Sequence, residues 1–360
     1  MDKLSARDML YMQRCLQLAR CGAGSTSPNP MVGAVIVCDD RIIGEGYHIR
    51  AGEPHAEVNA VNSVAERDRH LLERSTIYVS LEPCSHYGKT PPCCDLIIAR
   101  RIVRVVIATT DFNAQVNGGG ISRMRDAGIE VVVGLLESES RRLNSAFFAY
   151  HQQVRPFVTL KWAQSADGFI DRLRDGGLAL GISNGVSRVA VHKLRSMHDA
   201  ILVGTRTALL DNPSLDVRHW AGRAPLRLVI DRENTLPVTL RLFDGSHPTV
   251  LFTARRDDGR FGKNVEQVVL DFSRDIIPQI LGFLHSCKLN SLLVEGGAVL
   301  LQSFIDAGMW DTVRIEVNPS LFVRDGVEAP AFPAFHPVRE ELCGGNKVLV
   351  FERSNLKTAN

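Results

Sequence analysis

The stretch LEPCSHYGKTPPC at residues 81–93 decides the first half of the fold, together with HAE at residues 55–57. The two stretches supply His55 and two Pro-Cys steps. Imidazole nitrogen and thiolate sulfur are ligands that zinc prefers, and three protein ligands leave the fourth tetrahedral position open for water. The sequence therefore predicts a catalytic zinc site held by His55, Cys84 and Cys93.

Glu57 follows this histidine by two residues, at the start of a predicted helix. Zinc deaminases carry a His-x-Glu and Pro-Cys-x-x-Cys signature in which the glutamate moves protons. Coordination lowers the pKa of a zinc-bound water from about 15.7 to about 7. A carboxylate must then take the water's proton and return it to the leaving ammonia. We assign this role to Glu57.

The spacer between the two cysteines departs from that signature. Eight residues separate Cys84 from Cys93, where the signature has two. One glycine and two prolines let the intervening loop turn back, so the two thiolates can still meet. The same loop would then carry Ser85, His86 and Lys89 over the metal.

Cysteine usage supports a metal centre over a disulfide framework. Six of the eight cysteines lie in the first 94 residues, and clustered cysteines in a reducing compartment indicate metal binding or catalysis. Cys94 and His86 are rival ligands on sequence alone, and Cys93 is favoured because it directly follows two prolines. A purely structural zinc would close its tetrahedron with such a fourth protein ligand and would not need Glu57.

The composition fits a globular chain of two or three domains. The chain has 360 residues, of which 45% are hydrophobic and 23% charged, with a formal net charge of +2; this excludes a disordered chain. Neither half has the basic excess typical of nucleic-acid binding. The apolar runs are shorter than the roughly 20 residues that span a bilayer, and residues 1–10 lack the apolar core of a signal peptide. We expect a cytoplasmic protein that binds neither nucleic acid nor membrane.

Helix and strand patterns alternate along the chain, which predicts two α/β units, the first with three layers. In the first unit the predicted strands are 32–38, 41–46, 76–81, 104–108 and 130–133, and the predicted helices are 10–20, 56–65, 95–100, 121–127 and 138–151. After a linker at 154–156, the predicted strands are 157–161, 200–203, 227–230, 249–252, 267–270, 291–294 and 312–317, and the predicted helices are 186–196, 275–286 and 298–307. Residues 172–181 are expected to form a mobile loop.

Longer motifs extend over nearly the whole chain. They are SPNPxVGAV from Ser27, GEPHAE from Gly52, the stretch at 81–93, KxAxSxDG from Lys161, VGxxT from Val203, DNPSL from Asp211 and VEGG from Val294. Together they resemble the bifunctional deaminase/reductase family of bacterial riboflavin biosynthesis. The resemblance implies an α/β protein with an N-terminal three-layer cytidine-deaminase-like domain at residues 1–151 and a C-terminal dihydrofolate-reductase-like α/β domain at residues 156–360.

The resemblance also implies two successive reactions. The first is zinc-dependent hydrolytic removal of the 2-amino group from 2,5-diamino-6-(ribosylamino)pyrimidin-4-one 5′-phosphate. The second is NADPH-dependent reduction of the ribosyl to a ribityl chain. The implied cofactors are one Zn²⁺ per chain and NADPH, the implied partner is a phosphorylated pyrimidine, and a homo-oligomer is expected.

Further deaminase-site residues are implied by the same motifs. They are Asn29, His48, Lys89, Asp111 and Asn113. An asparagine amide can both donate to and accept from a pyrimidinone edge, and a lysine offers a point charge to a phosphate. The family commonly has Asp-Pro-Asn-Pro where this chain has Asp-Phe-Asn-Ala at residues 111–114, so both prolines are lost.

The second half contains no GxGxxG after a predicted strand, which argues against a Rossmann cofactor site. Instead a strand runs into Glu295-Gly296-Gly297 and a helix, where the backbone can approach a pyrophosphate closely. The resemblance implies NADPH contacts at Ala163, Thr207, Asp211, Gly297, Ala298, Val299, Leu300, Leu301, Gln302 and Ser303. It implies reductase-substrate contacts at Arg195, Leu215, Arg218 and Glu295, with Lys161 near the reacting sugar.

This half also departs from the family. Residues 181–183 read Gly-Ile-Ser where the family usually has Trp-Ile-Thr/Ser, so a tryptophan that could stack on the cofactor is absent. The neighbouring substrate-binding serine position falls on Ala179. The cation that would select NADPH over NADH is not fixed by any motif, and Arg232 is one candidate.

Three other functions would each require sequence features that differ from those of this chain. A deaminase acting on tRNA or nucleoside bases would have a basic face and a two-residue cysteine spacer, and the sequence has neither. A reductase fused to an inactive deaminase shell would lack part of the set formed by His55, Glu57, Cys84 and Cys93, which is intact. A non-enzymatic zinc module would need a fourth protein ligand.

Overall fold

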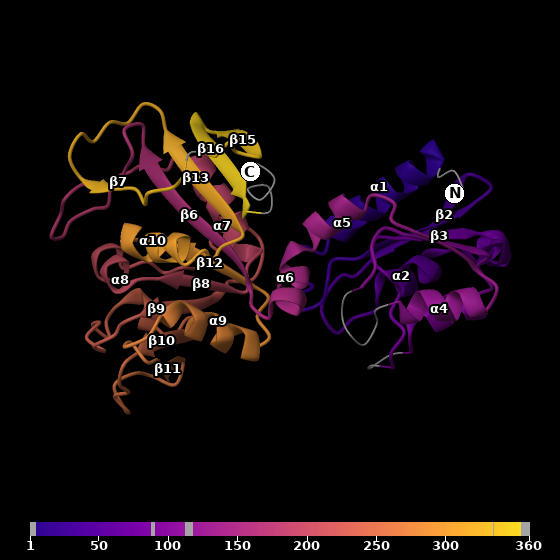
Figure 1. The fold of residues 1–360 in the computed structure, drawn as a ribbon, viewed down its shortest axis with the longest axis horizontal. Helices are drawn as coiled ribbons and strands as arrows, with labels where there is room; N and C mark the ends of the chain where they lie inside the picture. Colours follow the sequence, from indigo (N-terminus) through magenta and orange to yellow (C-terminus); the bar gives the residue numbers. More distant parts are fainter. Residues whose placement is uncertain (1–4, 88–90, 112–117, 334, 354–360) are drawn as a thin grey trace. The chain divides into compact units, whose positions relative to one another are not determined.

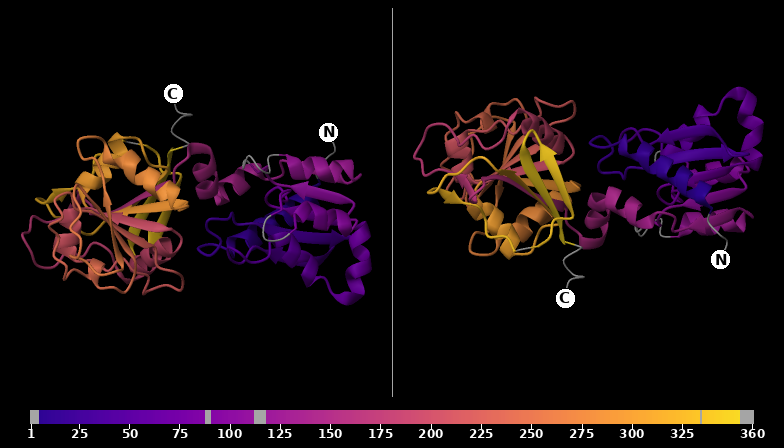
Figure 2. Two further views of the ribbon diagram at one scale, coloured as in Figure 1. Left: turned by 90° about the horizontal axis from the view of Figure 1, so that it is seen from below. Right: turned by 90° about the horizontal axis from the view of Figure 1, so that it is seen from above.

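The computed structural model describes residues 5–87, 91–111, 118–333 and 335–353. The chain divides into two compact units, Met1–Val154 and Arg155–Asn360, and each is described by itself (Figure 1 and Figure 2). Within the described residues, no helix has the length and apolar character needed to cross a membrane.

The first unit is built on a five-stranded sheet with the strand order β2-β1-β3-β4-β5. The strands are β1 (Gly33–Cys38), β2 (Arg41–Tyr47), β3 (Thr76–Val79), β4 (Arg104–Ile107) and β5 (Glu130–Val133). β1 pairs antiparallel with β2 and β3, whereas β3, β4 and β5 run parallel. The segments after β3 and β4 therefore leave the sheet at the same edge, and the amide of Glu82 donates to the carbonyl of Thr109 across it at 3.0 Å.

Helices cover both faces of this sheet (Figure 1). On one face, Met12 and Cys15 of α1 (Ala6–Arg20) pack with Val35 of β1. On the other, Ala34 and Ile36 pack in one cluster with α2 (Ala56–Ser63), α3 (Cys93–Ala99) and α4 (Gly119–Asp126). Successive residues of β1 thus face opposite layers, as the predicted three-layer arrangement requires.

α2, which carries Glu57, packs very closely on β2. A Cβ atom added at Gly46 would lie 2.3 Å from the backbone nitrogen of Ala60. No side chain fits in that space, so glycine is required for the helix to approach the strand. The start of α2 is therefore held rigidly against the sheet.

Several helix boundaries differ from the sequence prediction, and α1 begins at Ala6 instead of residue 10. The single helix expected at 138–151 is two helices, α5 (Glu137–Leu143) and α6 (Ser145–Gln153). At the break, the buried Asn144 side chain accepts from the amide of Met31 at 2.7 Å and donates to its carbonyl at 2.9 Å. α2 ends at Ser63, before a 3-10 helix at Glu66–Arg74 that the pattern did not predict.

The second unit contains a nine-stranded sheet with the order β11-β10-β9-β8-β12-β6-β13-β16-β15. Its strands are β6 (Phe157–Ser165), β8 (Ala200–Val203), β9 (Leu226–Ile230), β10 (Thr249–Thr253), β11 (Val265–Val269), β12 (Ser291–Glu295), β13 (Thr312–Asn318), β15 (Arg339–Cys343) and β16 (Asn346–Glu352). The strands from β11 to β13 in this order are parallel, and β16 and β15 extend the sheet antiparallel. Ligands of such sheets bind outside the carboxyl ends of the parallel strands.

Helices cover both faces of this sheet as well. Its helices are α7 (Gly185–Ser196), α8 (Thr205–Asp211), α9 (Ile276–Ser286) and α10 (Ala298–Asp306). Residues of α9 and α10 pack with Leu202 and Val294 on one face, and residues of α7 and α8 pack with Ile201 and Leu293 on the other. A two-stranded sheet joins β7 (Phe169–Asp171) to β14 (Val327–Glu328). The sequence patterns did not predict β7, β14, β15, β16 or α8.

Candidate active sites

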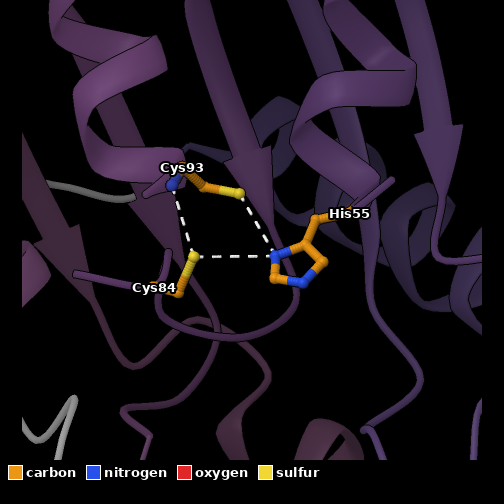
Figure 3. Close-up of side chains that lie close together, drawn as sticks. All are labelled: His55, Cys84 and Cys93. Atoms are coloured by element: carbon orange, nitrogen blue, oxygen red, sulfur yellow. Dashed lines mark hydrogen bonds between the residues drawn. The ribbon is translucent and has the colours of Figure 1, made fainter. Parts of the chain in front are cut away.

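Figure 3 shows the candidate metal centre of the first unit. His55 is the N-cap of α2, Cys93 is the first residue of α3, and Cys84 lies in the segment after β3. The Nδ1 atom of His55 lies 3.6 Å from Cys84 Sγ and 3.4 Å from Cys93 Sγ, and the three ligand atoms all lie within 4.8 Å of one another. The eight-residue spacer therefore does not keep the two sulfurs apart.

These three residues fit zinc. With Zn–N and Zn–S bonds of about 2.0–2.3 Å in a tetrahedron, neighbouring ligand atoms lie roughly 3.5 Å apart. The two nitrogen-to-sulfur distances of 3.4 and 3.6 Å match that separation. The donor set also matches, because one imidazole and two thiols are borderline-soft ligands typical of zinc.

The two thiols share a proton unequally. The hydrogen bond from the Cys93 thiol lowers the pKa of Cys84 to about 4, with His55 adding to the effect. The same hydrogen bond and burial raise the pKa of Cys93. The backbone amide of Cys93 also donates to Cys84 Sγ at 3.3 Å. The centre is thus prepared to present one thiolate, and metal binding must displace the remaining proton.

The two rival ligands lie outside this cluster. Cys94 is buried and its Sγ donates to Oδ1 of Asp95 at 3.6 Å, and burial raises its pKa to about 11. His86 is exposed. Within the described part of the chain, the group of metal-binding side chains contains His55, Cys84 and Cys93 and neither rival.

Glu57 lies in the first turn of α2 and is 3% exposed. Burial raises the pKa of its carboxyl group to about 7, and the negative charge of Cys84 acts in the same direction. The carboxylate also lies within hydrogen-bonding reach of Cys93, so it adjoins a candidate ligand. A carboxyl group with a pKa near neutrality can both take up and give back a proton.

His48 and Asn29 form a pair beside the metal centre. The rings of His48 and His55 are nearly perpendicular, with 5.5 Å between their centroids. His48 Nδ1 donates to the carbonyl of Pro54 at 3.1 Å, so its Nε2 accepts from Asn29 Nδ2, also at 3.1 Å. Burial lowers the pKa of His48, which favours this neutral form. His48 thus orients the Asn29 amide.

Of the other predicted deaminase residues, Asp111 is buried at the end of the segment after β4. Lys89 and Asn113 lie outside the described residues. Phe112 and Ala114, which stand where the family usually has prolines, also lie outside them. The sequence analysis gave no role to Glu82, although it stands in the motif at 81–93. Its buried carboxylate accepts from four backbone amides, those of Asp111, Gly118, Gly120 and Ile121, at 3.2 to 3.4 Å.

The second unit has a cavity of about 810 Å³ at the carboxyl ends of its parallel strands. Among the predicted reductase residues, the cavity lining includes Lys161, Ala163, Thr207, Asp211, Glu295, Gly297, Ala298, Val299, Leu300, Leu301 and Ser303. Arg195, Leu215, Arg218 and Gln302 are outside the lining. One cavity therefore gathers residues from motifs that are more than a hundred positions apart.

The four residues outside the lining have other contacts. Arg195 Nη2 donates to Glu295 Oε2 at 2.7 Å, and this pair is almost fully buried. Leu215 packs in the hydrophobic core. Arg218 is half-exposed and pairs with Asp216, while Gln302 donates to Asp306 and accepts from the amide of Ala331.

The turn between β12 and α10 is tightly built. Gly296 has a φ of +90°, and a Cβ atom added there would lie 2.7 Å from Cγ2 of Thr207. The amide of Gly297 donates to Thr207 Oγ1 at 3.0 Å. Thr207 thus fixes the glycine turn at the cavity, where a bound pyrophosphate would approach the backbone.

The loop at residues 172–181 forms part of the cavity wall through Ala179, Leu180 and Gly181. Its Arg174, which the sequence analysis did not single out, has a side chain that is only 7% exposed and forms ion pairs with Asp171 and Asp211. The loop is therefore anchored to the end of α8. Ser183 follows the loop and donates to Glu316 Oε2 at 2.7 Å.

Two family models match the chain. The model of the cytidine and deoxycytidylate deaminase zinc-binding region matches residues 5–109, and the model of the RibD C-terminal domain matches residues 156–325. The riboflavin biosynthesis protein RibD of Aquifex aeolicus is 40% identical over 319 residues, covering 87% of each chain. That of Escherichia coli is 36% identical over 335 residues, covering 89% of each.

Solved structures agree over almost the full length. The diaminohydroxyphosphoribosylaminopyrimidine deaminase/5-amino-6-(5-phosphoribosylamino)uracil reductase of Thermotoga maritima is 36% identical, with a TM-score of 0.88 over 97% of this chain and 99% of that one. Form 1 of Acinetobacter baumannii RibD is 31% identical, with a TM-score of 0.84 over 96% and 98%.

The family resemblance and the fold class predicted from the sequence are thereby confirmed. The zinc-binding family model also agrees with the cluster of His55, Cys84 and Cys93 in the first unit. The chain belongs to the RibD family of bifunctional riboflavin-biosynthesis enzymes, with a zinc-binding deaminase domain followed by an NADPH-using reductase domain.

Proposed function

We propose that the deaminase domain, residues 1–151, hydrolytically removes the 2-amino group of 2,5-diamino-6-(ribosylamino)pyrimidin-4-one 5′-phosphate. The reductase domain, residues 156–360, then reduces the ribosyl group of the product to a ribityl chain. The observation that carries the proposal is the three-ligand cluster with a buried carboxyl group beside it. A structural zinc site would need a fourth ligand in place of that carboxyl group.

In the first reaction, His55 Nδ1 and the sulfurs of Cys84 and Cys93 would hold the metal. Zinc, when bound, acidifies a water molecule so that it can attack an amidine-like ring carbon at neutral pH. Glu57 takes a proton from the attacking water on its carboxylate and delivers it to the amino group, which leaves as ammonia.

The substrate ring is oriented by Asn29, Asp111 and Asn113 in this proposal, with Lys89 at the phosphate. The contact between His48 and Asn29 supports the assignment of Asn29. Because the neutral imidazole accepts from the amide nitrogen, the amide oxygen of Asn29 is left in a defined direction to accept from an exocyclic amino group. His48 then acts by holding Asn29.

In the second reaction, bound NADPH would supply a hydride for the sugar carbon C1. Lys161 and Glu295 are register partners on the adjacent parallel strands β6 and β12, so both sit at the same level of the cavity. Arg195 fixes the Glu295 carboxylate and keeps its pKa below the ordinary value against the effect of burial. Apolar lining residues such as Leu180, Ile182 and Ile230 exclude water from the transfer.

The remaining predicted contacts belong to the same proposal. In this proposal NADPH would contact Ala163, Thr207, Asp211 and the segment 297–303, and the substrate would contact Arg195, Leu215 and Arg218. Arg218 supplies a guanidinium for the 5′-phosphate. The proposal also includes a cytoplasmic homo-oligomer with no nucleic-acid or membrane partner, and light scattering of the purified protein tests the assembly.

Turnover of the diaminopyrimidinone phosphate, with and without NADPH, tests the two reactions. We expect ammonia release in both mixtures and NADPH oxidation only after ammonia release. Arg218→Ala should impair NADPH oxidation and leave ammonia release nearly unchanged. NADPH oxidation without prior ammonia release would contradict the order, and equal loss of both activities in Arg218→Ala would contradict the assignment of Arg218 to the reductase site.

A further inference from the structure

We propose that Arg206 binds the 2′-phosphate of NADPH and thereby selects NADPH over NADH. The inference rests on the proposed use of the second-unit cavity as the cofactor site. Arg206 lies in α8, directly after β8, and it lines that cavity.

The strand order gives the cavity two ends of different chemistry. Its lining comes from the carboxyl ends of β9, β8, β12 and β6, which are neighbours in this order. Lys161 and Glu295 mark the reacting end, at β6 and β12. The turn at Gly296 and Gly297 follows β12, so a pyrophosphate placed there leaves the nicotinamide toward β6 and the adenosine toward β8 and β9.

The adenosine end is suited to a purine nucleoside. Ile230, the last residue of β9, and Ile276, the first residue of α9, supply apolar lining for a ring. Thr205 Oγ1 donates to the carbonyl of Ile230 at 2.6 Å, which ties the start of α8 to the end of β9. The residue that follows Thr205 is therefore held at this end of the cavity.

The guanidinium of Arg206 is available to bind an anion. Within the described residues, no ion pair joins it to a carboxylate, and its side chain is exposed. Arg174, which also lines the cavity, is neutralised by Asp171 and Asp211. A guanidinium fork matches two phosphate oxygens, and NADH has only a hydroxyl at that position. The charge of Arg206 therefore adds affinity for NADPH alone.

Arg232, the candidate from the sequence, has a different environment. It does not line the cavity. Its Nε lies 3.3 Å from Glu233 Oε1, and its guanidinium lies over the Phe272 ring at 5.8 Å from the centroid. The structure therefore favours Arg206 over Arg232 for this phosphate.

Arg188 provides a matched control. It lines the same cavity and is exposed, but it lies on α7. The N-cap of that helix, Asn184, donates to the carbonyl of Cys343 in β15. β15 is the edge strand at the other end of the strand order from β9. Arg188→Ala thus removes a cavity cation without touching the adenosine end.

The test is direct binding measured by calorimetry on the zinc-loaded full-length protein. The probes are adenosine 2′,5′-bisphosphate and adenosine 5′-monophosphate, which differ only in the 2′-phosphate, followed by NADPH and NADH. Arg206→Ala should weaken the bisphosphate and NADPH by about 10- to 100-fold and leave the other two within about twofold. Arg206→Lys should restore part of the preference, and Arg188→Ala should leave the NADPH/NADH ratio of dissociation constants unchanged.

Three results would overturn the inference. In the first, Arg206→Ala weakens NADPH and NADH equally or affects neither. In the second, Arg232→Ala abolishes the preference while Arg206→Ala retains it. In the third, the wild-type protein binds neither nucleotide, which overturns the reductase proposal as well; the first two results leave that proposal standing.

Discussion

In the first unit, His55, Cys84 and Cys93 bring three ligand atoms within 4.8 Å of one another. In the second unit, a cavity of about 810 Å³ is lined by backbone turns and by both apolar and charged side chains from residues 161 to 327. A metal centre needs particular side-chain types, whereas a hydride-transfer site needs a shaped, water-poor space. A metal centre can therefore be identified from residue types and their spacing, whereas a hydride-transfer site can be identified only from how distant segments pack.

The largest expected effect is loss of the activity of the first unit while the activity of the second unit is retained. Cys84→Ala removes one of three zinc ligands, so the protein should lose its zinc and its ammonia release altogether. NADPH oxidation with substrate already deaminated should stay within about twofold of wild type if the units are independent. Metal analysis and the two activity assays measure this. The control is Cys21→Ala at an exposed position, which should retain zinc and both activities. Loss of the reductase activity in Cys84→Ala would contradict the independence of the two units.

Glu57→Gln should separate metal binding from proton transfer within the first unit. The amide cannot move protons, so kcat for ammonia release should fall by about 10²–10⁴-fold. The zinc content should remain at the wild-type level, because Glu57 is not one of the ligands. The exposed Glu53→Gln serves as the control. Normal deamination by Glu57→Gln would falsify the assignment of the proton carrier.

Gly296→Ala tests the shape of the second site. The added Cβ would meet Thr207 at 2.7 Å, and a φ of +90° is strained for alanine. KM for NADPH should rise by about 10-fold or more, with ammonia release unchanged. The matched change is Gly282→Ala in α9, where a Cβ meets nothing within 4 Å. If both variants keep a wild-type KM, the glycine turn does not shape the cofactor site.

The smallest effect concerns stability and pH in the first unit. Burial acts to raise the pKa of Asp8, but hydrogen bonds from Arg104, Tyr78 and Ser5 outweigh it and hold the pKa well below its ordinary value. A lowered folded-state pKa stabilises the fold at pH values above the ordinary aspartate pKa of about 3.9, and this contribution is lost as the pH falls through the folded-state pKa.

Asp8→Asn should therefore lower the free energy of unfolding by about 1–3 kcal/mol at neutral pH. The difference from wild type should shrink as the pH falls below about 4. Urea unfolding across this pH range measures it, with the exposed Asp126→Asn as the control. A difference that grew toward acid pH would mean that the Asp8 carboxylate does not stabilise the unit.

The same contrast explains how much could be predicted from the sequence. The apolar runs that form β1, β3, β4 and β8 were placed to within two residues, because a buried strand needs such a run whatever surrounds it. His55, Cys84 and Cys93 could be selected because few residue types bind zinc. Glycines and a helix start likewise marked the turn after β12.

What could not be predicted depends on tertiary contacts. Asn144 breaks a helical pattern because its side chain pairs with the distant Met31. Arg174 lies in a loop that is polar in sequence, and only the fold shows that its side chain forms ion pairs with Asp171 and Asp211. No local pattern carries information about such partners.

The four amides that converge on Glu82 have a consequence for how this site can change. Asp111 and Gly118 are both anchored to one oxygen of that carboxylate, so the two points are fixed independently of the amino acids between them. Phe112 and Ala114, which replace the family's prolines, fall inside that interval. An evolving sequence can therefore exchange residues in this interval while the amides of Asp111 and Gly118 stay bound to Glu82.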